Sequence, residues 1–161
     1  MTSFLKAMDV IVKYQHNSPP IQVVSIATEL GINVYTVKEW PNDLSGKLQK
    51  DEGSKSGFSI YVNAKHPDVR KRFTIAHEIA HYILHQDKIG DGIVEDALYR
   101  SGLSNADETA ANSMAADILM PWHLINKAIN SGINSVEELA AKFNVSNSSM
   151  SIRLGVPYEY K

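Results

Sequence analysis

Hydrophobic residues recur at three- and four-residue intervals over much of the chain, which is the spacing of helices that bury one face. Signals that end a helix, such as Gly31 and the pair Met120-Pro121, separate these stretches. The second helix is expected to begin at Pro19 or Pro20, because proline suits the first turn of a helix. The pattern predicts helices over residues 3–15, 19–30, 67–85, 105–119, 121–130, 136–143 and 148–154.

Between residues 32 and 63 the pattern changes to short runs of β-branched and aromatic residues. The runs at residues 32–37 and 58–63 are the clearest, and residues 44–49 form a weaker one. Because the connections between these runs are short, they favour an antiparallel meander. We therefore expect an α+β fold in which a small three-stranded antiparallel sheet packs on a mainly helical core.

The chain is expected to divide into a domain of residues 1–130 and a helical extension of residues 131–161 that packs on it. Two short helices in the extension flank a turn at residues 144–146, which is the outline of a helix-turn-helix. The second of these helices offers one arginine, Arg153, among several serines. This is a weak basic footprint for DNA phosphates, so packing or binding of a protein partner is expected rather than direct DNA binding.

Composition narrows the chemistry that the chain can perform. A length of 161 residues with 43% hydrophobic residues suffices for one compact core, and a net charge of −2 gives no basic surface for nucleic acid or membrane lipid. No run reaches about 18 apolar residues, and no signal-peptide pattern begins the chain, so a cytoplasmic protein without membrane association is expected. Because there is no cysteine, His, Asp and Glu are the remaining strong ligands for a transition metal.

The sequence HEIAH at residues 77–81 carries the strongest chemical signal. In a helix, His77 and His81 leave the same face one turn apart and can bind a single metal ion. Glu78 lies about 100° further round the helix, where it can reach a water molecule bound to that metal. A random HExxH match is expected only about 0.01 times in a chain of this composition, so two incidental histidines on a solvated helix are the weaker explanation.

Three residues are candidates for a third metal ligand. His85 lies about 12 Å along the helix axis from His77, too far for one ion to contact both on an unbroken helix, so an outer role suits it better. Asp87 fits the last position of the longer HExxHxxGxxH pattern, but Leu84 stands where that pattern has glycine. Ser104 is expected to cap an alanine-rich helix that carries Glu108 in its first turn. This helix can lie close against the HEIAH helix, so that Glu108 would complete a gluzincin-like zinc site. The competing interpretation of Glu108 is a surface carboxylate favoured by the helix dipole.

The chain contains RFTIAHEIAHYILH at residues 72–85 and then ETAANSMAADILMP at residues 108–121. These two motifs, in this order, resemble those of the ImmA/IrrE metallo-endopeptidases. The family carries close variants of AHELGHxxLH and ExxANxFAxxLLMP. Ala80 stands where the family often has glycine, and Met114 where it often has phenylalanine, and both are packing changes. The resemblance spans residues 20–155 and implies a zincin-like metallopeptidase core.

The resemblance also implies roles for the matching residues. His77, His81 and Glu108 would be the zinc ligands, with Mn²⁺ as the alternative metal, and Glu78 would be the catalytic glutamate. Asn112 lies one turn after Glu108 on the same helix face, and is a candidate hydrogen-bond partner for a ligand.

The oxyanion formed when water attacks a peptide carbonyl needs a further hydrogen-bond donor. Tyr82, Tyr99 and His85 are candidates, and the sequence does not choose among them. The resemblance implies limited proteolysis of a partner, commonly a helix-turn-helix transcriptional repressor. Because family members also occur beside repressor-like antitoxins, the alternative is a non-proteolytic toxin- or antirepressor-type binding partner, in which the metal site stabilises the fold or serves another reaction.

Overall fold

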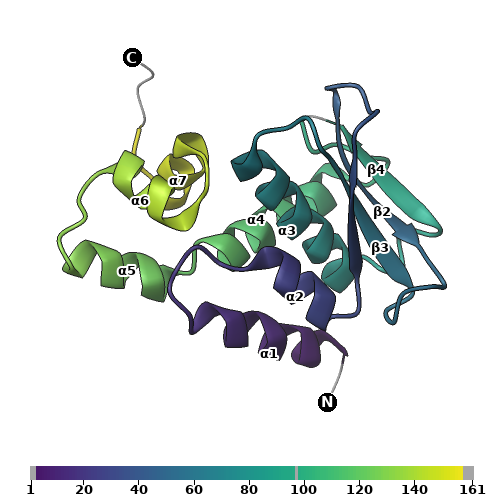
Figure 1. Ribbon diagram of the computed structural model, residues 1–161, viewed down its shortest axis with the longest axis horizontal. Helices are drawn as coiled ribbons and strands as arrows, with labels where there is room; N and C mark the ends of the chain where they lie inside the picture. The colour runs from purple at the N-terminus through teal and green to yellow at the C-terminus, as the bar shows by residue number, and fades with distance from the viewer. Residues whose placement is uncertain (1–2, 97, 158–161) are drawn as a thin grey trace.

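A computed structural model describes residues 3–96 and 98–157 (Figure 1). Within these ranges, no helix is long and apolar enough to cross a membrane. The helices are α1 (Ser3–Gln15), α2 (Val23–Glu29), α3 (Asp68–Leu84), α4 (Asn105–Leu119), α5 (Trp122–Asn130), α6 (Val136–Phe143) and α7 (Asn147–Leu154). The strands are β1 (Asn33–Val37), β2 (Leu44–Lys50), β3 (Phe58–Asn63) and β4 (Gly92–Asp96).

The predicted helices are present, and only the start of α2 differs clearly. This helix begins at Val23 rather than at Pro19 or Pro20. The chain first buries Ile21, which is 1% exposed, in the core, and it turns into the helix only after that residue. The cap predicted for α4 is formed, since the Ser104 hydroxyl accepts a hydrogen bond from the Asp107 amide at 3.1 Å.

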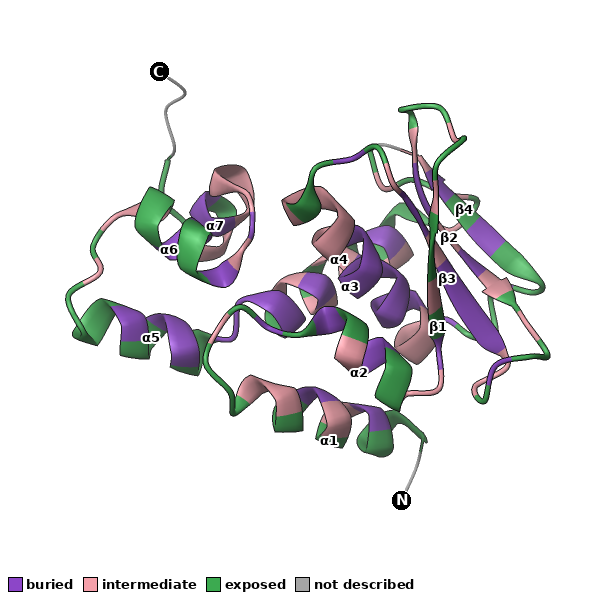
Figure 2. Ribbon diagram, viewed as in Figure 1, coloured by how far each residue is buried: buried purple, intermediate pink, exposed green. Residues whose placement is uncertain are grey.

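The sheet has four strands in the order β1-β3-β2-β4. Strand β2 pairs antiparallel with β3 and with β4, whereas β1 pairs parallel with β3. The predicted three-stranded antiparallel sheet is therefore wrong in the number of strands and in the placement of β1. Most residues on both faces of β3 are buried, which is typical of a central strand with a neighbour on each side (Figure 2). Short connections indicate only that strands lie near one another, and they do not fix this order.

Strand β4 lies between α3 and α4, in residues 86–102, where the sequence pattern predicts neither a helix nor a strand. Its side chains alternate, so that Ile93 and Glu95 are buried and Val94 is exposed. It forms one edge of the sheet and pairs with β2 alone. The ladder contains a bulge between Leu44 and Gly46, and Glu95 pairs with Gly46 beside it. Such bulges redirect side chains locally.

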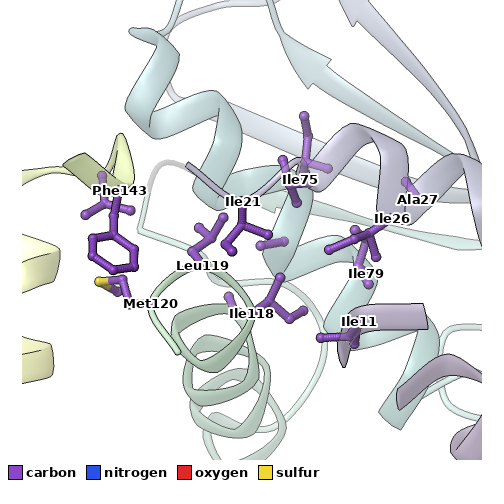
Figure 3. Close-up of a cluster of buried hydrophobic side chains, with 14 of the residues drawn as sticks. Ile11, Ile21, Ile26, Ala27, Ile75, Ile79, Ile118, Leu119, Met120 and Phe143 are labelled. Atoms are coloured by element: carbon purple, nitrogen blue, oxygen red, sulfur yellow. The ribbon is translucent and has the colours of Figure 1, made fainter. Parts of the chain in front are cut away.

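Helix α3 occupies the centre of the molecule, packed against β2 and β3 on one side and against α4 on another. Small residues, Ala76 and Ala80 on α3 and Ala111 and Ala115 on α4, are fully buried and let the helices approach closely. Around them lies the hydrophobic core, part of which Figure 3 shows, with Ile11, Ile21, Ile26, Ile75, Ile79, Ile118, Leu119, Met120 and Phe143 labelled. The side chains of α3 are thus held in a rigid and solvent-poor environment.

The end of α6 and the turn that follows it contact the beginning of α3. The Arg72 guanidinium donates to the carbonyl oxygens of Asn144, at 3.1 Å, and Phe143, at 3.4 Å. The side-chain amide of Asn144 in turn donates to the Asp68 carboxylate at 2.8 Å. Phe143 itself is fully buried in the core. The segment thus contains two short helices with a turn between them, and this turn is bonded to the same helix that carries the HEIAH sequence.

Candidate metal centre

Four side chains from three elements converge beside α3. His77 and His81 come from α3, Glu95 from β4, and Glu108 from the first turn of α4. One ligand atom of each lies within 4.8 Å of the others, and all four residues are buried. The structure thus brings together the three residues predicted as ligands and adds Glu95.

The distances within this cluster suit a small metal ion. The Nε2 atoms of His77 and His81 are 3.1 Å apart. Glu95 Oε1 lies 3.3 Å from His77 Nε2 and 2.9 Å from His81 Nε2, and Glu108 Oε1 lies 3.9 Å and 2.6 Å from the same two atoms. In a tetrahedral site with zinc bonds of about 2.0–2.1 Å, ligand atoms are about 3.3 Å apart. The observed distances lie on both sides of this value.

The hydrogen bonding of the cluster gives a second indication of a cation. The buried carboxylate oxygens of Glu78, Glu95 and Glu108 have no partner with hydrogen-bond geometry among the described residues. Buried charges in proteins are normally paired or coordinate a metal. Two imidazole nitrogens with two carboxylate oxygens are a suitable donor set for a divalent transition metal. The residues present therefore fit such an ion.

The orientation of the His77 ring is set by Asn112 on α4. Asn112 Oδ1 lies 2.8 Å from His77 Nδ1. Because an amide oxygen can only accept, His77 Nδ1 carries the proton and donates, which leaves a lone pair on Nε2. This lone pair is on the nitrogen that faces the cluster, as a metal ligand requires.

A hydrogen-bonded series lies behind the second histidine. His81 Nδ1 is 2.9 Å from His85 Nδ1, and His85 Nε2 is 3.3 Å from Asp107 Oδ1. The same Asp107 oxygen accepts a hydrogen bond from Lys88 at 2.9 Å. Burial and the charge of His81 lower the pKa of His85, so His85 is neutral and accepts through Nδ1 while donating through Nε2. This arrangement turns His81 Nε2 toward the carboxylates of the cluster.

Glu78 is fully buried between α3 and the sheet. A methyl group placed on Gly46 would lie 3.6 Å from Glu78 Oε1, so the carboxylate lies directly beneath β2. Burial and the negative charges of Glu95 and Glu108 raise the pKa of Glu78 well above its usual range, although His81 opposes the shift. A buried carboxyl group with a raised pKa is suited to proton transfer near neutral pH.

The pKa values of the clustered residues shift in opposite directions. Burial alone would lower the pKa of His81, but its contacts with Glu108 and Glu95 raise it to about 9. Burial alone would raise the pKa of Glu95, but its contacts with His77 and His81 lower it to about 2. Burial raises the pKa of Glu108. The centre therefore favours positive charge between its carboxylates, and a divalent cation would supply that charge.

The remaining candidates from the sequence lie in different places. Tyr99 packs against His77, with ring centroids 5.0 Å apart. Tyr82 packs edge-on against Phe58, with centroids 5.7 Å apart, and belongs to the hydrophobic core rather than to the cluster. Asp87, the alternative third ligand, is exposed and does not join the four clustered residues.

Glu95 is the functional candidate that sequence reasoning missed, because the pattern of residues 86–102 predicts no strand. Two signals in the sequence indicate it. A connection of this length without secondary structure is uncommon in a compact domain. Within it, the β-branched pair Ile93-Val94 follows Gly92, and Glu95 stands two residues after Ile93, on the same face of an extended strand.

A cleft of about 970 Å³ opens beside the centre. Residues of α3, α4 and α7 line it, together with Tyr99. Tyr99 and Asn112, which both contact His77, belong to its wall, and Arg70, Asp117 and Arg153 contribute charged groups. The cleft therefore borders residues that are in direct contact with His77.

The fold and this centre define a class of metalloproteins in which two histidines of a central helix face carboxylates from neighbouring elements. The family model described as the IrrE N-terminal-like domain, a peptidase family, matches residues 27–155. The chain therefore belongs to the ImmA/IrrE metalloprotease family, which confirms the resemblance noted in its sequence.

Two similar proteins extend this comparison. The radiation response metalloprotease IrrE of Deinococcus radiodurans is 37% identical over 94 residues, which are 56% of this chain and 28% of that protein. A solved structure of a Mycobacterium tuberculosis transcriptional regulator aligns with 99% of this chain and 48% of its own, with a TM-score of 0.64 and 16% identity, and so supports the fold. The chain thus spans less than half the length of either protein.

Proposed function

We propose that the protein is a zinc-dependent endopeptidase in which His77, His81 and Glu108 hold the metal and Glu78 is the general base. The observation that carries this proposal is the convergence of two imidazole nitrogens with Glu108 next to a fully buried Glu78. Membership of a metalloprotease family supports the same chemistry in general. Mn²⁺ is the alternative metal for this donor set.

The reaction follows from the positions of these groups. A zinc ion in the centre would polarise the scissile carbonyl and lower the pKa of a water molecule towards about 7. Glu78, whose pKa burial raises, accepts the proton of the attacking water and passes it to the leaving amine. Asn112 and His85 hold the two imidazoles in the orientation that points both Nε2 atoms at the metal.

The substrate would lie in the cleft beside Tyr99 and Asn112. Of the three residues proposed as a further donor, Tyr99 is the one in contact with His77 and with accessible space. Burial raises the pKa of Tyr99, so its phenol remains protonated and able to donate near neutral pH. We therefore assign the oxyanion contact to Tyr99 rather than to Tyr82 or His85.

The substrate that we propose is a helix-turn-helix transcriptional repressor, which the protease cuts at one position. The resemblance to the ImmA/IrrE endopeptidases supports this substrate. The names of the two similar proteins, a radiation response metalloprotease and a transcriptional regulator, are compatible with it.

The test uses purified full chain, zinc and a helix-turn-helix repressor encoded beside it. Wild-type protein should produce one discrete cut that mass spectrometry locates. Glu78→Gln should abolish the cut while metal analysis shows unchanged zinc content, because Glu78 is not a ligand. Glu52→Gln removes an exposed glutamate and is the matched control, which should cut as wild type does. Cutting by Glu78→Gln at the wild-type rate would refute the role of Glu78.

One observation favours a second candidate function, a non-proteolytic partner of a repressor-like antitoxin. The cluster offers four protein ligands, and zinc sites with four protein ligands are usually structural, whereas catalytic sites keep one position open. Under this hypothesis the two proteins form a stable complex and the partner stays intact after long incubation with zinc-loaded protein. The mass spectrum of the incubated mixture separates the two functions.

A further inference from the structure

Glu95 reaches the centre from an element that differs from those of the other three residues. His77, His81 and Glu108 stand on helices packed in the middle of the molecule. Glu95 stands on β4, an edge strand of five residues that pairs with β2 alone. Although its strand is at the edge, the Glu95 side chain is fully buried and points away from exposed Val94.

The Glu95 carboxylate makes its closest contacts with the two histidines of the centre. Its Oε1 atom lies 2.9 Å from His81 Nε2 and 3.3 Å from His77 Nε2, which are the nitrogens that face the metal position. Neither carboxylate oxygen has a partner with hydrogen-bond geometry among the described residues. A carboxylate buried this completely requires a compensating charge, and the metal position is where its oxygen already lies.

We propose that Glu95 is a fourth protein ligand that fills the coordination position used for water in a hydrolytic site, so that this conformation is a closed, latent form of the enzyme. The inference rests on the metal site of the proposed function and concerns its regulation. Three protein ligands leave a fourth position open in catalytic zinc sites, and four close it. The enzyme becomes active when the Glu95 carboxylate leaves the metal.

The position of β4 makes such a withdrawal feasible without disturbing the other ligands. The strand has one neighbour, so releasing it breaks a single ladder, and a bulge already interrupts that ladder beside Glu95. The histidines and Glu108 are held by α3 and α4, which pack mainly against each other. Edge strands with few partners belong to the parts of a protein that open most readily.

The experiment compares full-length wild type, Glu95→Ala and Glu95→Gln, each loaded with Co²⁺, whose visible absorption reports coordination. Asp91→Asn is the matched control, since it removes an acidic charge just before β4 from a side chain that is completely exposed. Competition with a chelator measures metal affinity, and titration with azide measures access to a coordination position. Glu95→Gln keeps the size of the side chain and serves as the test variant if Glu95→Ala does not fold. Circular dichroism shows which variants are folded.

Removing Glu95 should weaken Co²⁺ binding by about tenfold or more, the loss that even outer contacts of a metal site produce. Azide should change the spectra of both Glu95 variants at concentrations that leave wild type and Asp91→Asn unchanged. Equal azide responses in wild type and the Glu95 variants, or unchanged metal affinity, would overturn the inference.

The peptidase assay then separates this inference from the proposed function. Both are supported when the Glu95 variants, zinc-loaded, cut the repressor faster than wild type. When azide binds only to the Glu95 variants but no protein cuts, the closed site stands and the peptidase proposal fails. When wild type cuts and already binds azide, the peptidase proposal stands and the latent form does not exist.

Discussion

Gly46 of strand β2 faces Thr74 of helix α3 with no room for a methyl group, and replacing it tests how tightly the sheet packs on the metal helix. A methyl group added at Gly46 would lie 2.5 Å from Thr74 Cγ2 and 3.2 Å from the Tyr61 carbonyl oxygen. Carbon atoms in contact are normally about 3.5–4.0 Å apart, so the methyl group overlaps Thr74 by about 1 Å or more. The hydrogen bond between the Thr74 and Tyr99 hydroxyls, at 3.1 Å, restrains the Thr74 side chain from rotating away.

We expect Gly46→Ala to reduce the free energy of unfolding by about 1–3 kcal/mol, the usual cost of overpacking a core. For a chain of this size, this corresponds to a fall in Tm of roughly 2–12 °C. Differential scanning calorimetry or urea denaturation measures the change. Gly102→Ala is the control, because nothing lies within 4 Å of a methyl group there, and its effect should stay within about 0.5 kcal/mol.

A second substitution tests the cause. Thr74→Ser removes Cγ2, the atom with which the new methyl group collides, and keeps the hydroxyl that bonds Tyr99. The double variant Gly46→Ala/Thr74→Ser should therefore recover most of the stability lost in Gly46→Ala, with a coupling energy of about 1–2 kcal/mol. Additive losses in the double variant would refute the steric explanation and show that the backbone of β2 itself requires glycine.

Three further predictions concern the centre and the surface. Asn112→Ala should weaken metal binding about 10–100-fold in a chelator competition, because the His77 ring loses its orienting hydrogen bond, whereas Ser113→Ala should not. Metal at 100 times its Kd should stabilise the fold by about 2.7 kcal/mol, so that a chelator lowers the Tm by roughly 5–11 °C in a thermal-shift assay, and an unchanged Tm would exclude binding to the folded state. The Ser59 hydroxyl lowers the pKa of Asp51 below its unfolded value of 3.8, so the stabilisation is complete above that pH and is lost as the pH falls through the folded pKa. The difference in Tm between wild type and Asp51→Asn should therefore shrink below about pH 4, and a difference independent of pH would contradict this assignment.

The parts of the fold and site that could be predicted from the sequence are those set by local spacing. A separation of four residues placed His77 and His81 on one helix face, and a serine cap with a run of alanines placed Glu108 on a helix that approaches them. Both inferences need only the geometry of a helix and the size of its side chains. They hold because neither depends on how distant strands pair.

The parts that could not be predicted depend on pairing between distant segments. Strand β1 lies beside β3 rather than β2, and the pattern within each strand does not contain this choice. Strand β4 is only five residues long and is stable because β2 supplies its hydrogen bonds. From the sequence alone, Glu95 is therefore expected to be a surface residue. It is buried only because β4 pairs with β2.

Hydrogen bonds and ion pairs link the buried centre to the protein surface through His81, His85, Asp107 and Lys88. Metal binding requires that the Nε2 atoms facing the ion carry no proton. The series starts on the opposite side of the His81 ring and ends at the half-exposed Lys88 ammonium. A change of charge at that surface lysine, such as acetylation, would therefore alter how readily the interior accepts its cation, although the lysine does not line the cleft.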